Sequence, residues 1–180
     1  MTTSATPTGR VLFQRLGEID VLIDRTFRAP VTDVWASLTE PERVARWIGT
    51  WTGEAGPGRT ITFLMTAEES AQPEEVDIRE CVPPRRLVID FRQGDASLEP
   101  WRVTVELEGA DDQTTLRFRT TVPEPFDASD VGPGWEYYID RLGAAIAGSP
   151  MPEWDAYFPS QQPYYQAAIA AARASDGQGA

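Results

Sequence analysis

Residues 27–47 read FRAPVTDVWASLTEPERVARW, and this stretch decides the fold because a strand end, a turn and two short helices follow one another without a spare residue. It begins at the close of residues 19–27, in which apolar side chains largely alternate with charged ones. Such alternation predicts a strand with one buried face. Pro30 then ends the strand, because proline has no N–H to donate to a neighbouring strand.

Two short helices are predicted between Pro30 and Gly49. The first carries its apolar side chains on one face within residues 34–38. Residues 39–42, Thr-Glu-Pro-Glu, match a capping box, so we expect the second helix to begin there and to bury the apolar side chains within residues 44–48. Gly49 is expected to end this helix.

Further runs of alternating residues follow, which predicts that the rest of the core is mostly sheet. They cover residues 59–67, 76–82, 86–92, 101–108 and 114–122. The last two are long neighbouring strands with polar side chains on one face, which is typical of an antiparallel sheet that is wetted on one side. Residues 134–147 carry apolar side chains at helical spacing and predict a long helix that covers the apolar face of the sheet.

Length and composition indicate one soluble domain. A chain of 180 residues with 41% apolar content can build one sizeable core. The net charge of −12 would repel nucleic acid and anionic membranes, so we expect neither as a partner. The sequence has no run of about 18 apolar residues and no signal-peptide pattern at its start, which predicts a cytoplasmic protein.

Three residue types are absent from the sequence, and their absence excludes several chemistries. There is no His, Lys or Asn, and all 16 basic residues are Arg. A Ser-His or Cys-His dyad, a His-ligated metal and a lysine Schiff base are therefore excluded. Cys81 is the single thiol and has no visible His or Lys partner that would activate it. Acidic pairs such as Glu74-Glu75 fall at turns without metal-loop spacing, so we predict no metal, no cofactor and no catalytic residue.

The chain divides into three expected parts. Residues 1–15 predict a flexible arm, with residues 11–13 resting on the domain, and residues 16–149 form the domain itself. Residues 150–180 form an aromatic-rich extension that includes a short helix near residues 166–174. Two interpretations of this extension stay open: it folds back as a lid or buttress, or it forms a self-association surface that makes a homodimer.

Several short motifs resemble one known superfamily. They are Ala29-Pro30, Val34-Trp35, Leu38-Thr39, Pro41-Glu42, Trp47, Pro83-Pro84 with Leu87, Thr114-Thr115-Leu116, Gly134-Trp135 and Asp140-Arg141-Leu142. In this order they resemble the SRPBCC (START-like) superfamily, and within it the bacterial homologues of the heat-shock-protein-90 ATPase activator. The resemblance runs from about residue 18 to residue 148.

The resemblance implies an α+β helix-grip fold. In that fold a curved antiparallel sheet of six to seven strands wraps around a long C-terminal helix, and two short helices follow the first strand. Members include lipid-transfer domains, polyketide cyclases and aromatases, and plant hormone binders, so the resemblance implies an internal cavity without naming one activity. The sequence leaves no room for the additional amino-terminal domain of the eukaryotic co-chaperone, so we expect no chaperone-activating role.

The candidate site is a mostly apolar pocket between the long helix and the sheet. Residues on the apolar phase of the strands and of the helix are its expected lining. They are Arg25, Trp47, Trp51, Phe63, Met65, Ile78, Glu80, Ile89, Phe91, Trp101, Val103, Phe118, Trp135, Tyr138, Ile139 and Leu142. Trp47, Trp51 and Tyr138 are the strongest candidates for ligand contacts, and most of the other aromatic residues are expected to be core.

Arg25 and Glu80 are the charged members of this set. Each shares the phase of the buried residues in its strand, and a buried charge is costly unless it is paired. They therefore either meet a partner, face a ligand or a hydrated cavity, or reach water through a strand end or a bulge.

Three functions are compatible with the sequence. The first is a non-catalytic protein that binds a small apolar or aromatic molecule. The second is an enzyme of the polyketide cyclase or aromatase kind, in which the cavity orients a reactive chain. The third is a module that binds a chaperone or a regulator. No sequence motif establishes catalysis, so we favour the first.

Overall fold

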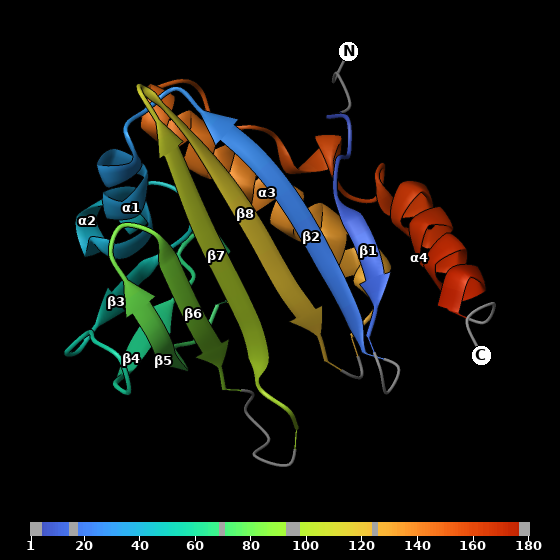
Figure 1. Ribbon diagram of the computed structural model, residues 1–180, viewed down its shortest axis with the longest axis horizontal. Coiled ribbons are helices and arrows are strands. Elements are labelled where there is room, and N and C mark those ends of the chain that lie inside the picture. The colour runs from blue at the N-terminus through green and yellow to red at the C-terminus, as the bar shows by residue number, and fades with distance from the viewer. Residues whose placement is uncertain (1–4, 15–17, 69–70, 93–97, 124–125, 177–180) are drawn as a thin grey trace.

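The computed structural model of the protein describes residues 5–14, 18–68, 71–92, 98–123 and 126–176 (Figure 1). Its strands and helices follow one another in this order: β1 (Arg10–Phe13), β2 (Ile19–Phe27), α1 (Val31–Thr39), α2 (Pro41–Val44), β3 (Thr50–Thr52), β4 (Thr60–Leu64), β5 (Glu74–Val82), β6 (Arg86–Phe91), β7 (Trp101–Ala110), β8 (Gln113–Val122), α3 (Ala128–Ala147), the 3-10 helix η1 (Trp154–Ala156) and α4 (Gln162–Asp176). The predicted α+β order is confirmed.

All the strands belong to one antiparallel sheet, in the order β1-β2-β8-β7-β6-β5-β4-β3. In Figure 1 the long helix α3 lies behind β8 and β2, α1 and α2 lie near the β3 end, and α4 lies beside β1 at the other end. The curved sheet with a long helix across one face is the helix-grip fold. No helix among the described residues is both long and apolar enough to cross a membrane.

The sheet has eight strands, so the predicted number of six to seven was too low. The additional strands are the two outermost ones, β1 and β3, which are four and three residues long. Such short strands contain too few residues to show a period of two in the sequence. β1 lies within the expected amino-terminal arm, where Val11 pairs with Val21 of β2 and is buried; residues 1–4 and 15 of that arm lie outside the described residues.

Two short helices follow β2, as predicted, but the prediction of a capping box at the start of the second helix is wrong. The Thr39 hydroxyl donates to the Trp35 carbonyl at 2.8 Å and closes the last turn of α1 instead of capping α2. α2 therefore begins after Glu40, which makes no side-chain cap, and it ends at Val44. Trp47 follows in hydrogen-bonded turns and is buried.

α3 begins at Ala128, six residues before the predicted start at residue 134. The Asp127 side chain caps it by accepting a hydrogen bond from the Ser129 N–H at 2.8 Å. The sequence pattern missed the first turns because residues 132–134 are Gly-Pro-Gly, and both residue types disfavour helix. The predicted end is confirmed: Gly148 adopts a left-handed conformation, with φ of 64°, and closes the helix.

Candidate ligand-binding site

An apolar cavity of about 210 Å³ lies between α3 and the inner face of the sheet. The residues that line it are Leu38, Thr39, Val44, Trp47, Ile48, Trp51, Ala55, Gly56, Ile61, Phe63, Val76, Ile78, Cys81, Leu87, Ile89, Phe91, Val103, Val105, Leu116, Phe118, Trp135, Ile139 and Leu142. The strands from β3 to β8 supply most of this lining, because alternate side chains of each strand point to the same face. α3 closes the other side with one face of its apolar stripe.

The indole groups of Trp47 and Trp51 present carbon to the cavity. The Trp47 Nε1–H donates to the Ser37 carbonyl at 2.9 Å, and the Trp51 Nε1–H donates to the Thr39 carbonyl at 3.2 Å. α1 therefore satisfies both ring donors through its backbone. A ligand in this cavity meets apolar ring surface from these residues rather than hydrogen-bond donors.

A second pocket, of about 260 Å³, adjoins the first near the amino-terminal half of α3. Its lining consists of Met65, Glu68, Ala71, Gln72, Glu74, Phe91, Trp101, Val131, Gly134, Trp135 and Tyr138. Phe91 and Trp135 line both spaces, so only these two rings are shared between the pocket and the cavity. We call this second pocket the acidic vestibule because both of its charged lining residues are glutamates.

The structure brings most of the predicted site residues together. Those that line the cavity are Trp47, Trp51, Phe63, Ile78, Ile89, Phe91, Val103, Phe118, Trp135, Ile139 and Leu142. Met65, Trp101 and Tyr138 line the acidic vestibule instead. Arg25 and Glu80 line neither space.

Glu80 leaves the inner face because β5 contains a bulge. Ile78 pairs with Ile89 and Glu80 pairs with Val88, so Arg79 is the extra residue. The bulge reverses the alternation, as a one-residue slip must. Glu80 is half-exposed on the outer face, where it accepts a hydrogen bond from Arg86 Nε at 2.8 Å. Cys81 consequently faces the cavity, although the sequence pattern placed it on the polar phase.

Arg25 does point to the inner side of the sheet, but it meets α3 rather than a ligand. Its Nε donates to Asp140 Oδ1 at 2.8 Å, and its guanidinium also pairs with Glu136. These two carboxylates are one helical turn apart on α3. They satisfy the charge of Arg25, which is only 17% exposed, and hold its pKa above the ordinary value although desolvation opposes them.

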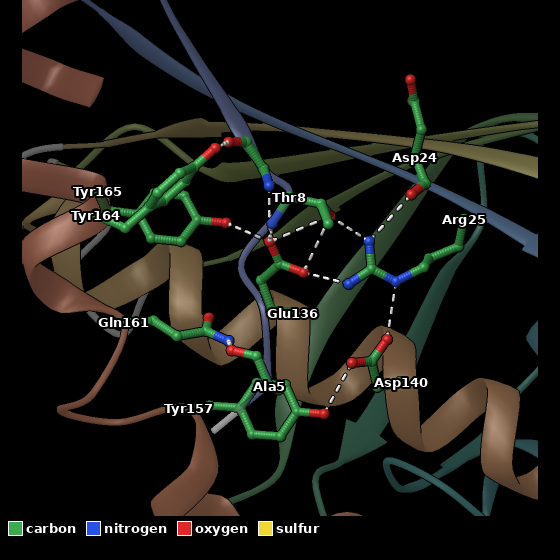
Figure 2. Close-up of polar contacts among 11 residues, drawn as sticks. Ala5, Thr8, Asp24, Arg25, Glu136, Asp140, Tyr157, Gln161, Tyr164 and Tyr165 are labelled. Carbon is green, nitrogen blue, oxygen red and sulfur yellow. Dashed lines mark hydrogen bonds and ion pairs between the residues drawn. The ribbon is translucent and has the colours of Figure 1, made fainter. Parts of the chain in front are cut away.

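Glu136 is the centre of a buried polar network that joins the two ends of the chain (Figure 2). It is fully buried, and its Oε1 accepts from the Gly9 N–H at 2.7 Å and from the Tyr165 hydroxyl at 2.9 Å. Asp140 accepts from the Tyr157 hydroxyl at 2.7 Å. The network ties the segment before β1 and the carboxyl-terminal segment to α3. None of the network residues named here lines the cavity.

The carboxyl-terminal extension packs against its own chain. Tyr165 of α4 is fully buried and Tyr157 is nearly so, and Tyr164 donates to the Gly9 carbonyl at 2.9 Å. Figure 1 places α4 beside β1, away from α1 and α2. Of the two interpretations left open by the sequence, the buttress describes these contacts, and α4 does not cover the cavity.

The comparisons with known proteins place this fold in a family. The family model described as activator of Hsp90 ATPase homolog 1-like protein matches residues 28–147. The chain belongs to this family. The match confirms the resemblance to the SRPBCC superfamily and covers the sequence from the end of β2 to the end of α3.

Several solved structures share this fold over most of the chain. CalU16 from Micromonospora echinospora is 26% identical, with a TM-score of 0.71, over 91% of this chain and 97% of its own. EF2215 from Enterococcus faecalis, a conserved protein of unknown function, is 18% identical, with a TM-score of 0.70, over 92% of both chains. DynU16, a putative protein in the dynemicin biosynthetic locus, is 21% identical, with a TM-score of 0.59, over 74% of this chain and 49% of its own. No curated protein matches the sequence.

The predicted site lacked several of the lining residues, namely Leu38, Thr39, Val44, Ile48, Ala55, Gly56, Ile61, Val76, Cys81, Leu87, Val105 and Leu116. Ala55 and Gly56 lie between β3 and β4, and nothing in a loop of small residues indicates that it borders a cavity. Cys81 was missed because a bulge leaves no mark on the alternation. Val76, Leu87, Val105 and Leu116 were also missing from the predicted site, although they stand on the buried phases that the sequence shows.

Proposed function

We propose that the protein binds a small apolar or aromatic molecule in the cavity between α3 and the sheet. The observation that carries this proposal is the cavity of about 210 Å³ with an almost wholly apolar lining. An engineered apolar cavity of about 150 Å³ accommodates benzene, so a space of this size suits a molecule with one or two rings.

The chemistry of the lining supports binding rather than catalysis. Cys81 is the nucleophilic side chain in the lining, and burial raises the pKa of its thiol, which disfavours the reactive thiolate. Thr39 already donates its hydroxyl proton to the backbone of α1. Among the described lining residues no other acid or base faces the cavity, so proton transfer to a ligand has no agent there.

The test is a cavity-filling substitution with a control on the other face of the same strand. Val103→Phe adds a ring inside the cavity, whereas Thr104→Phe adds the same ring on the outer face. We expect calorimetry with 2-naphthylmethanol to show binding to the natural chain and to Thr104→Phe, and a loss of at least about tenfold in affinity in Val103→Phe. Thermal melts establish that both variants fold. Unchanged affinity in a folded Val103→Phe variant contradicts the proposal.

The cysteine content and the net charge support a cytoplasmic site of action without a nucleic-acid partner. The single cysteine gives no disulfide, as is usual in a reducing compartment, and the net charge is −12. The cation-poor composition disfavours phosphate backbones and anionic lipid surfaces.

A further inference from the structure

The acidic vestibule is built differently from the apolar cavity that it adjoins. Four aromatic residues of β6, β7 and α3 form its walls: Phe91, Trp101, Trp135 and Tyr138. The Trp135 and Tyr138 rings stand edge to face, with their centroids 6.2 Å apart. Aromatic ring faces carry partial negative charge and attract cations that lie within about 6 Å of the centroid.

Two carboxylates stand at the same pocket. Glu68 accepts a hydrogen bond from the Tyr138 hydroxyl at 2.7 Å, which joins one carboxylate directly to an aromatic wall. Glu74, at the start of β5, faces the pocket with no arginine partner among the described residues. Partial desolvation, and then the charge of Glu68, raise the pKa of the Glu74 carboxyl.

On the outer face of the sheet, in contrast, two carboxylates pair with arginines of the chain. Asp90, at the outer face of the sheet, pairs with both Arg79 and Arg102, and Asp77 pairs with Arg92. The vestibule has no such cation in its described lining. Both glutamates are solvent-exposed, and a cation bound between them and the four rings would be attracted by the carboxylates and by the ring faces together.

We propose that the acidic vestibule binds the positively charged amine or quaternary ammonium group of an organic ligand. This proposal and the proposed function, on which the apolar part rests, together define the ligand class. Such a ligand has an apolar or aromatic body in the cavity and an ammonium group beyond Phe91 and Trp135. The rings supply cation–π attraction, and Glu68 and Glu74 supply the opposite charge.

Three probes separate this inference from the proposed function. 2-Naphthylmethanol is neutral, 2-naphthylmethylammonium replaces its hydroxyl by a charged amine on the same skeleton, and tetramethylammonium is the cation without an aromatic body. We expect the natural chain to bind the naphthyl amine about tenfold more tightly than the alcohol. Tetramethylammonium is expected to shift the NMR indole signals of Trp101 and Trp135.

Two variants test which carboxylates act, and a third controls for total charge. Glu68→Gln and Glu74→Gln each remove one negative charge from the vestibule, and glutamine at position 68 keeps an acceptor for Tyr138. Glu75→Gln removes the same charge from the next residue, which pairs with Arg92 away from the vestibule. We expect the first two to lose most of the preference for the amine, with the affinity for the alcohol within about twofold, and Glu75→Gln to keep the preference.

Stability gives a readout that a structural role would not produce. Because the pKa of Glu74 is raised in the folded chain, Glu74→Gln is expected to melt at the same or a higher temperature at pH 7 while it loses affinity for the amine. Equal affinity for amine and alcohol in the natural chain overturns the inference and leaves the proposed function intact. Tetramethylammonium binding without naphthyl binding supports the vestibule and contradicts the cavity.

Discussion

Among single residues, Glu136 shows how one buried carboxylate holds distant segments together. A fully buried charge is stable only when donors surround it, and Glu136 receives them from Gly9, Tyr165 and Arg25. These partners belong to three parts of the chain: the segment before β1, then α4, and then β2. The residue that the sequence marked for a ligand, Arg25, therefore has an internal role.

The Tyr165 hydroxyl gives this network a signature at alkaline pH. Desolvation, followed by the nearby charge of Glu136, raises the pKa of Tyr165 in the folded chain. The unfolded chain ionises this hydroxyl from about pH 10, so the hydroxyl stabilises the fold below that pH and loses this contribution as the pH rises.

We predict that Tyr165→Phe lowers the free energy of unfolding by about 1–3 kcal/mol at pH 7, because Glu136 loses a donor. The difference from the natural chain should shrink between about pH 9 and pH 11, where the unfolded natural chain loses its proton. Urea denaturation at several pH values measures both quantities. Equal stability of the two chains at pH 7 would show that Tyr165 acts through ring packing alone, and a difference that stays constant over this range would contradict a raised pKa of the hydroxyl in the folded chain.

Between elements, the contact of α4 with α3 depends on a glycine. A Cβ built at Gly132 would overlap the Tyr165 ring, whereas a Cβ at Gly134 meets nothing within 4 Å. The Gly-Pro-Gly sequence that concealed the start of α3 therefore contains the slot into which α4 docks. Glycine lowers the local helix propensity of α3, but at position 132 it allows α3 and α4 to approach closely.

Gly132→Ala and Gly134→Ala form a matched pair on the same helix. Gly132→Ala is expected to destabilise the fold by about 1–3 kcal/mol through overpacking. Gly134→Ala is expected to stabilise it by about 0.5–1 kcal/mol, since alanine favours helix and meets no obstacle. Chemical denaturation gives both values. In a Tyr165→Ala background the cost of Gly132→Ala should largely vanish, and its persistence would place the overlap elsewhere.

For the whole molecule, the carboxyl-terminal extension completes the fold of its own chain. Tyr157 and Tyr165 donate to the two carboxylates of α3 that pair with Arg25. Trp154 and Tyr164 remain exposed at the surface of the same extension. The buried contacts make a contribution to stability that does not depend on a second copy.

A chain that ends at Gly148 should therefore melt at a lower temperature than the full chain by the same amount at every protein concentration. Calorimetric scans over a hundredfold range of concentration, with gel filtration of both chains, measure this. A loss that grows as the concentration rises, together with a change from dimer to monomer on truncation, would instead support the self-association surface. A dimer that survives truncation would exclude the extension as its main interface.

The sequence by itself determined the order of the elements, the apolar inner face of the sheet and about half of the cavity lining. Side-chain direction alternates within every strand, so residues such as Val103 and Ile89 could be assigned to the inner face before any contact was known. The same is true of the stripe on α3 that carries Ile139 and Leu142.

Only the tertiary structure decided where the charged candidates lie and how the interior is divided. The bulge at Arg79 turned Glu80 outward and Cys81 inward, because one extra residue reverses every later side chain without changing the composition of the strand. The partners of Arg25 stand on α3, more than a hundred residues away along the chain. Phe91 and Trp135 line both the cavity and the acidic vestibule, and periodicity predicts which face a ring occupies but not the spaces that it borders.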